Sequence, residues 1–108
     1  MTTHVTVEFD DAFRAEFAVW QRGLSPDPTD RKRYADIYLE ELCRRLVRFG
    51  GRPRGYITEV SGPSPRYWCE LSGGAWVGYT VTDRPTLVSR SRVVRLLSLR
   101  RRPPLPAT

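Results

Sequence analysis

The run from Arg66 to Val81 constrains the fold of this chain more than any other part of it. Residues 67–71 alternate, so that Trp68 and Glu70 share one face of a strand and the apolar residues share the other. The glycines that follow accept the positive φ angles of a short hairpin loop. Residues 75–81 are then rich in aromatic and β-branched side chains. The pattern predicts a β-hairpin at the centre of the fold.

Three residues of this hairpin have more than one interpretation. Gly78 indicates either a bulge or a close approach of another group to the backbone. Trp68 is expected to cover the outer face of the sheet and Trp76 to lie in the core. On a sheet that binds single-stranded RNA, both rings would instead stack on bases.

Two amphipathic helices are expected before the hairpin, joined by a loop that contains two prolines. The expected boundaries are Val5–Phe9 for a first strand, Asp10 or Asp11 to Gly23 for the first helix, and Thr29 or Asp30 to Gly50 for the second. Later in the chain we expect Tyr56–Val60 as a second strand or an extended segment, Asp83-Arg84-Pro85 as a turn, and Arg92–Leu99 as a last strand.

The apolar stripe of each helix needs a surface to cover, and the sheet is the only one available. The sequence therefore predicts an α+β domain, in which a two-helix hairpin packs on a mainly antiparallel β-sheet in the order β-α-α-β-β-β. The domain spans residues 1–102, and a proline-rich tail, residues 103–108, follows it. The residues expected to be buried are Leu42, Leu46, Phe17, Leu71, Val81 and Leu97.

The charge of the chain is unevenly placed. The net charge is +6, and it divides into −4 for residues 1–30 and +10 for residues 31–108. Of the 18 basic residues only Lys32 is a lysine. Because guanidinium binds phosphate through a planar fork, this composition is typical of a protein that contacts RNA, DNA or a ribosome. A solvated surface encoded by a GC-rich genome accounts for it equally well.

Cysteine and histidine are scarce. Cys43 and Cys69 lie in apolar patterns, so we expect both to be buried and reduced rather than joined in a disulfide. With a single histidine beside them, neither a metal site nor another cofactor is expected. The sequence has no signal peptide and no apolar run near the length of a membrane span, so we expect a soluble, cytoplasmic protein.

The order of elements from Val5 to Arg102 resembles that of the RelE/ParE superfamily of bacterial toxins. The resemblance is most specific in residues 59–102. There a small turn at Ser61-Gly62 precedes an aromatic-led strand and a glycine hairpin. A Tyr79-Thr80-Val81 step and a last strand that ends in basic residues follow. The resemblance implies the toxin component of a type II toxin–antitoxin system, whose cognate antitoxin wraps the toxin with its tail. In the ribonuclease branch, such toxins cut messenger RNA on the ribosome.

The cleavage in that branch is attack of a 2′-hydroxyl on the neighbouring phosphate, which needs a base, a cation and an acid. The resemblance implies catalytic roles for Glu70, as the base, and for Arg102 and Arg95, as cations. Glu70 could equally be an exposed glutamate paired with an arginine, and Arg95 a surface ion-pair partner. The residues expected to contact nucleic acid are Arg66, Trp68, Arg100, Arg101, Arg44, Arg45 and Arg48.

The sequence also departs from the family pattern, and two other functions stay open. Family members commonly carry a basic residue where this chain has Trp76-Val77-Gly78, and the acid expected after the last strand is missing. The ParE branch, which acts on DNA gyrase, also lacks the ribonuclease residues, so the missing basic residue agrees with that branch. A basic module that binds nucleic acid or a partner protein without catalysis would share the fold. If the arginines form one surface, Arg66, Arg95 and Arg100–Arg102 are expected to cluster on one face, with Arg44, Arg45 and Arg48 near its rim.

Overall fold

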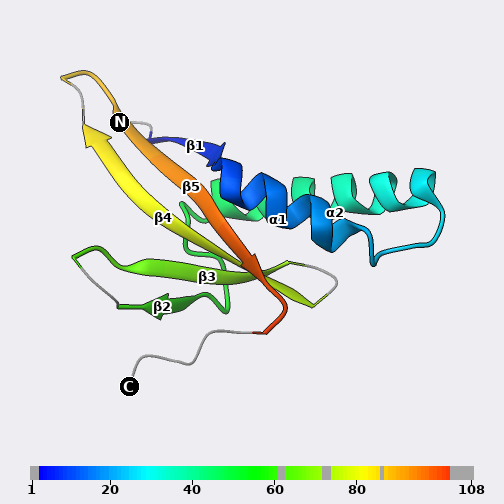
Figure 1. Ribbon diagram of the computed structural model, residues 1–108. Helices are drawn as coiled ribbons and strands as arrows, with labels where there is room; N and C mark the ends of the chain where they lie inside the picture. The colour runs from blue at the N-terminus through cyan, green and yellow to red at the C-terminus, as the bar shows by residue number, and fades with distance from the viewer. Residues whose placement is uncertain (1–2, 61–62, 72–73, 86, 103–108) are drawn as a thin grey trace.

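The computed structural model describes residues 3–60, 63–71, 74–85 and 87–102. The elements are β1 (Thr3–Phe9), α1 (Asp11–Gln21), α2 (Pro28–Arg48), β2 (Ile57–Glu59), β3 (Arg66–Leu71), β4 (Ala75–Pro85) and β5 (Arg90–Arg100). The strands form one sheet in the order β1-β5-β4-β3-β2 (Figure 1). β1 runs parallel to β5, and the other neighbours are antiparallel. The chain is therefore an α+β domain, as predicted, with a mixed sheet. None of the described helices is long and apolar enough to cross a membrane.

The second helix begins earlier than the predicted Thr29 or Asp30. Asp27 is its N-cap, and the Asp27 Oδ1 accepts a hydrogen bond of 2.8 Å from the backbone N–H of Thr29. Pro28 occupies the first helical position. A proline is well suited to that position, because the N–H it lacks would have no partner inside the helix. The prediction that both prolines belong to the connecting loop is therefore wrong for Pro28.

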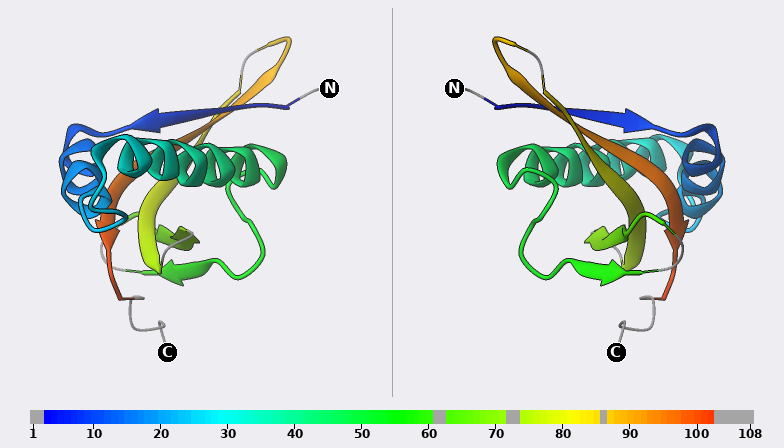
Figure 2. Two further views of the ribbon diagram at one scale, coloured as in Figure 1. Left: turned by 90° about the vertical axis from the view of Figure 1, so that its right-hand side faces the viewer. Right: turned by 90° about the vertical axis from the view of Figure 1, so that its left-hand side faces the viewer.

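Both helices pack on one face of the sheet and enclose the core between them and the strands (Figure 2). Leu42 and Leu46 of α2 and Leu71 of β3 are fully buried, as predicted. Phe17 and Val81 pack against this cluster but are only partly buried. We call the side of the sheet that faces the helices the helix face, and the other side the open face.

A bulge in β5 explains why the prediction that Leu97 is buried was wrong. The register between β4 and β5 shifts between Gly78, which pairs with Ser98, and Tyr79, which pairs with Leu96. Leu97 is the extra residue of this bulge, so it drops out of the alternation and is only half-buried. The next residue on the helix face is Leu99, which is buried in the core. The structure confirms both interpretations of Gly78: the register shift of the bulge begins beside it, and another side chain approaches its backbone closely, as described below.

The expected turn at Asp83-Arg84-Pro85 is strand instead. β4 continues to Pro85, which pairs with Arg90 at the start of β5. β3 pairs with β4 only as far as Tyr79. Pro85 therefore has no β3 beside it, and a strand edge of this kind tolerates proline. Residues 82–85 and 87–92, which we call the arm, project beyond the helices at the far end of the sheet (Figure 2). The expected strand at Tyr56–Val60 is confirmed but is shorter, as β2.

The loop after α2 is fixed to the sheet by one buried hydrogen bond. The hydroxyl of Tyr79 donates to the carbonyl oxygen of Gly51 at 2.6 Å, and burial raises the pKa of Tyr79 well above its ordinary value. Gly51 has a φ of 85°, and a Cβ there would lie 2.8 Å from Val81. Only glycine fits this position. The contact holds the following basic residue, Arg52, beside the base of the arm.

Candidate nucleic-acid interface

The register of the sheet places the central candidate residues in two rows on the open face. Glu70 of β3 pairs with Trp76 of β4, and Trp76 pairs with Arg100 of β5. In the adjacent row, Trp68 pairs with Gly78, which pairs with Ser98. Trp68 and Glu70 therefore share a face, as predicted, and the end of β5 lies beside them.

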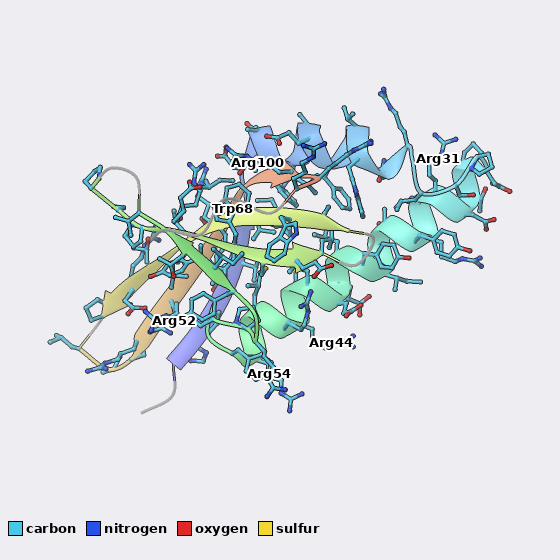
Figure 3. All side chains as sticks on the ribbon, turned by 90° about the horizontal axis from the view of Figure 1, so that it is seen from below. Arg31, Arg44, Arg52, Arg54, Trp68 and Arg100 are labelled. Atoms are coloured by element: carbon cyan, nitrogen blue, oxygen red, sulfur yellow. The ribbon has the colours of Figure 1, made fainter. Side chains whose placement is uncertain are left out.

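Trp68 fills the inner part of this surface. Its side chain is fully buried, and the guanidinium carbon of Arg100 lies 4.8 Å from the centroid of its ring (Figure 3). A Cβ on Gly78 would come within 2.8 Å of both the Trp68 ring and the Ser98 hydroxyl. The absence of that Cβ is what lets the ring lie flat against the strand. The prediction that a base stacks on Trp68 is wrong for this structure, because the ring has no free face.

Trp76 is the exposed aromatic of the pair. The prediction that it lies in the core was wrong, because its position in β4 alternates with Ala75 and Val77, which face the helices and are fully buried. Trp76 is half-buried on the open face, between Glu70 and Arg100. An aromatic ring in this position offers a surface on which a nucleic-acid base can stack.

Glu70 has an exposed side chain without an ion-pair partner among the described residues. Only its backbone is engaged, because the Glu70 carbonyl oxygen accepts a hydrogen bond of 2.7 Å from Arg45 Nη2. The pairing of β2 with β3 ends at Trp68, so this carbonyl lies beyond the end of β2 and needs another donor. The interpretation of Glu70 as half of an ion pair therefore has no support in this part of the chain. Arg45 instead supplies the hydrogen-bond donor that the backbone of β3 needs at Glu70.

Arg95 lies on the open face but is bound to carboxylates. Its Nη2 is 2.7 Å from Asp10 Oδ1, and its Nη1 is 3.5 Å from Glu8 Oε2. The hydrogen bond from Arg95 lowers the pKa of Asp10 below its ordinary value. Asp10 precedes α1 as its N-cap but makes no side-chain capping bond. Arg95 was considered as a catalytic cation or as a surface ion-pair partner. The structure shows it as an ion-pair partner.

The remaining predicted arginines do not form one cluster. Arg44 is paired with Glu40 at 2.8 Å on the exposed side of α2, and Arg48 lies over the ring of Phe49. Both belong to α2, whose buried side packs on the helix face, so they do not border the row of Glu70 and Arg100. Arg66 is half-buried in β3 opposite Glu59, whereas Arg101 and Arg102 are exposed just after β5. The open charges at this end of the sheet are thus Arg100, Arg101 and Arg102.

A second basic surface lies at the arm, and the sequence analysis did not single it out. Arg92 binds Asp83 through Nε at 2.6 Å and the Gly50 carbonyl through Nη1 at 3.0 Å. Arg90 and Arg84 extend the basic surface toward the tip. Arg52 lies near the base of the arm, and both Arg52 and Arg54 lie away from Arg100 (Figure 3). No local pattern in the sequence indicates it, because residues 82–85 of β4 are all exposed and show no apolar alternation.

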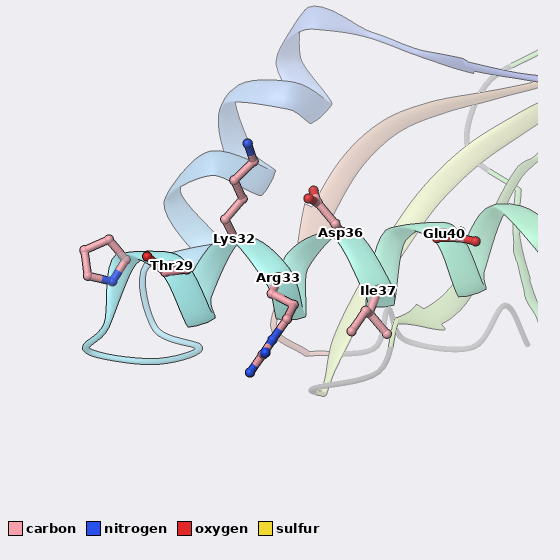
Figure 4. A pocket seen from close by; sticks show the side chains of 7 residues that line it. Thr29, Lys32, Arg33, Asp36, Ile37 and Glu40 are labelled. Carbon is pink, nitrogen blue, oxygen red and sulfur yellow. The ribbon is translucent and has the colours of Figure 1, made fainter.

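One hollow of the surface, of about 250 Å³, lies at the arm and is lined by Asp83, Pro85, Arg90, Ser91 and Arg92. Another hollow, of about 490 Å³, is open to solvent along the first half of α2 (Figure 4). Its lining residues are Pro28, Thr29, Lys32, Arg33, Asp36, Ile37 and Glu40. Within the described part of the chain, no three side chains of the kinds that ligate metals gather at one point. Cys43 and Cys69 are free thiols, and burial raises the pKa of Cys69 to about 12.

Comparison of this chain with protein-family models, with curated proteins and with solved structures finds no match. What the surface can do therefore follows from its own geometry. It combines an unpaired carboxylate, a half-buried indole and the exposed Arg100 in one row of the open face, with Arg102 exposed just after β5. Arg101 lines a hollow with Trp20 and Leu24, beside the end of α1. The groups of the row suit a single-stranded nucleic acid, whose phosphates bind guanidinium and whose bases stack on an aromatic ring.

Proposed function

We propose that this chain is the toxin component of a bacterial type II toxin–antitoxin system, of the RelE/ParE kind, that acts on ribosome-bound messenger RNA. The single observation that carries the proposal is the row of Glu70, Trp76 and Arg100 on the open face. Glu70 and Arg100 stand two strand spacings apart, about 10 Å, and their side chains are long enough to reach toward each other above Trp76. The element order of the fold also supports the proposal.

The proposed chemistry is transfer of a phosphoester within the RNA chain. The Glu70 carboxylate takes the proton of a 2′-hydroxyl, and the 2′-oxygen forms a bond to the adjacent phosphorus. The bond from phosphorus to the 5′-oxygen breaks, and the leaving oxygen takes a proton from water. Arg100 and Arg102 stabilise the negative charge that develops on the phosphate oxygens. Loss of one such donor typically lowers the rate on the order of 10²–10³-fold.

Two variants test the catalytic form of the proposal. Expression of the wild-type chain in bacteria should slow growth, and ribosomes with bound message should show cleavage. We expect weak or no cleavage of free RNA by the isolated protein, because the acid expected after the last strand to protonate the leaving oxygen is missing. Arg102→Ala should relieve growth inhibition more than Glu70→Gln does, and Asp36→Asn, a change at an exposed carboxylate of α2, should have no effect. Unimpaired growth at high soluble expression of the wild-type chain would contradict the proposal.

A second candidate function is a non-catalytic toxin directed at DNA gyrase. The observation that favours it is the ion pair of Arg95 with Asp10, which neutralises one of the three residues expected to act in catalysis. In this case Glu70→Gln would leave growth inhibition unchanged, and the inhibition would come with gyrase-dependent DNA damage instead of messenger RNA cleavage. In both cases we propose a cognate antitoxin that covers the basic surface with an acidic or amphipathic segment. Loss of toxicity and cleavage together in Glu70→Gln would decide for the ribonuclease.

A further inference from the structure

The tip of the arm exposes two large apolar side chains. Leu87 is 103% exposed and Val88 is 86% exposed, the highest values among the large apolar residues that the structure describes. Pro85 and Arg90, which pair with each other behind the tip, are exposed as well. Isolated apolar residues on a surface are ordinary, but two neighbours at the end of a projecting strand pair are available for a contact.

Two arginines stand behind this tip on opposite faces of the arm. Arg92 reaches Asp83 and the Gly50 carbonyl, which places both residues of this pair on the helix side. By alternation, Arg90 lies on that same side, and Arg84 lies on the other. Among the described residues neither Arg84 nor Arg90 has a carboxylate within ion-pair distance. The arm therefore carries Arg84 on one face and Arg90, beside the Asp83–Arg92 pair, on the other.

The dimensions of the arm match the major groove of B-form DNA. A single sheet layer with side chains on both faces is about 10 Å thick. The major groove is about 12 Å wide and about 8.5 Å deep, and it is known to admit a two-stranded ribbon. Arg84 pairs with Ser91, and the adjacent Pro85 pairs with Arg90, so the two arginines stand within one residue of each other along the arm, behind the tip. With the tip in the groove, their side chains extend from opposite faces of the arm toward the phosphates on the two walls.

We propose that the arm is a binding site for double-stranded DNA, with Arg84 and Arg90 on the phosphates of the two strands and Leu87 and Val88 against the base edges. Apolar side chains in the major groove contact the thymine methyl group. The minor groove of DNA, about 6 Å wide, is too narrow for the arm. Duplex RNA fits less well, because its major groove is deep and narrow and its minor groove is too shallow to flank both faces of the arm. The proposal does not depend on the action on messenger RNA proposed above.

The test is fluorescence anisotropy of a labelled 20-base-pair DNA duplex with the purified full chain. The variants are Arg84→Ala with Arg90→Ala, and separately Leu87→Ser with Val88→Ser. The matched control is Lys32→Ala with Arg33→Ala, which removes the same charge from the exposed start of α2. All of these side chains are exposed, and a circular dichroism spectrum of each variant verifies the fold.

Each phosphate contact contributes about −0.9 to the slope of log K against log salt. The arm variant loses two such contacts, so its slope should be less negative by about 2. Between 50 and 200 mM salt the wild-type chain should lose roughly 12-fold more affinity than the arm variant does. The tip variant should weaken binding at an unchanged slope. The proposal is overturned if the arm variant and the control bind alike, if the wild-type chain does not bind duplex DNA at 50 mM salt, or if it binds the duplex RNA of the same sequence more tightly than the DNA.

Discussion

The two ends of β5 carry arginines of the same chemistry in opposite situations. At the first end, Arg92 is bound to Asp83 and to the Gly50 carbonyl, and its side chain is 29% exposed. At the other end, Arg100 lies over the buried ring of Trp68 and is exposed, with no carboxylate partner among the described residues. Arg92 thus joins the arm to the end of α2, whereas Arg100 remains available to a ligand.

The difference shows that the basic composition has two roles in this fold. Arginines near the acidic N-terminal segment or near free carbonyls are used inside the structure, as Arg95, Arg92 and Arg45 are. Arginines beyond the reach of those groups, such as Arg100 and Arg102 at the far end of β5, have no carboxylate partner among the described residues. A count of basic residues alone cannot separate these two groups, because the partner of each arginine is distant in the sequence.

The largest expected effect concerns the packing beneath Arg100. Trp68→Ala should lower the free energy of unfolding by about 3–5 kcal/mol, because it removes a fully buried ring and leaves a cavity. Trp76→Ala, a change on the same face at a half-buried ring, should cost less than half as much. Urea unfolding of the two variants measures the difference. Equal losses would mean that the two rings are packed alike, contrary to the structure.

The second effect concerns the close approach at Gly78. Gly78→Ala should destabilise the chain by about 1–3 kcal/mol, because the added Cβ meets the Trp68 ring and the Ser98 hydroxyl. The matched control is Gly23→Ala, where the nearest atom to a Cβ, the Trp20 carbonyl oxygen, is 3.7 Å away. Thermal unfolding of both variants makes the comparison. If Gly78→Ala is as mild as the control, the ring does not lie against β4.

The comparison of the two ends can be made directly with one substitution at each. Arg92→Ala should cost about 1–2 kcal/mol, because it leaves the partly buried Gly50 carbonyl without its donor. Arg100→Ala should cost only about 0.5–1 kcal/mol, the usual value of an exposed cation–π contact. A larger loss for Arg100 than for Arg92 in chemical denaturation would reverse the assignment of the two roles.

The smallest effect is a dependence on pH at the bound end. The hydrogen bond from Arg92 lowers the pKa of Asp83 below its ordinary value of 3.8. Since the folded-state pKa is the lower one, Asp83 stabilises the fold above pH 3.8, and this contribution disappears as the pH falls through the folded-state pKa. Asp83→Asn should therefore have a lower melting temperature than the wild-type chain at pH 6, and the gap should close below pH 3.8. A gap that persists or widens in acid would show that Asp83 acts through something other than its charge.

Local patterns in the sequence predicted most of the fold. The alternation of residues 67–71 and the spacing of Leu42 and Leu46 gave the hairpin, the faces of β3 and the buried side of α2 correctly. The predictions failed where distant strands decide the outcome. The bulge that displaces Leu97 arises from the pairing of β4 with β5, and the proline at position 85 is tolerated only because β3 ends before it.

The candidate site was predictable only where a local pattern places its residues, and not where distant strands complete it. The shared face of Trp68 and Glu70 follows from alternation alone. The burial of Trp68 depends on a glycine in the next strand and on Arg100, which is 32 residues away along the chain. The ion pair of Arg95 with Asp10 joins β5 to the start of α1, and no local pattern indicates it. The arm was missed because the sequence between Asp83 and Ser91 has no regular hydrophobic pattern.

The most direct test of this account is an NMR titration of the ¹⁵N-labelled chain with two ligands, a single-stranded RNA and a DNA duplex. The account predicts that the RNA shifts the backbone amides of Glu70 and Arg100–Arg102 and the indole N–H of Trp76. The indole N–H of Trp20, which lies in the core, should stay in place. The DNA duplex should instead shift the amides of the arm, those of Asp83, Arg84 and residues 87–92. If both ligands shift the same residues, or if the RNA leaves Trp76 unmoved, the two ends of β5 do not have the separate roles assigned to them.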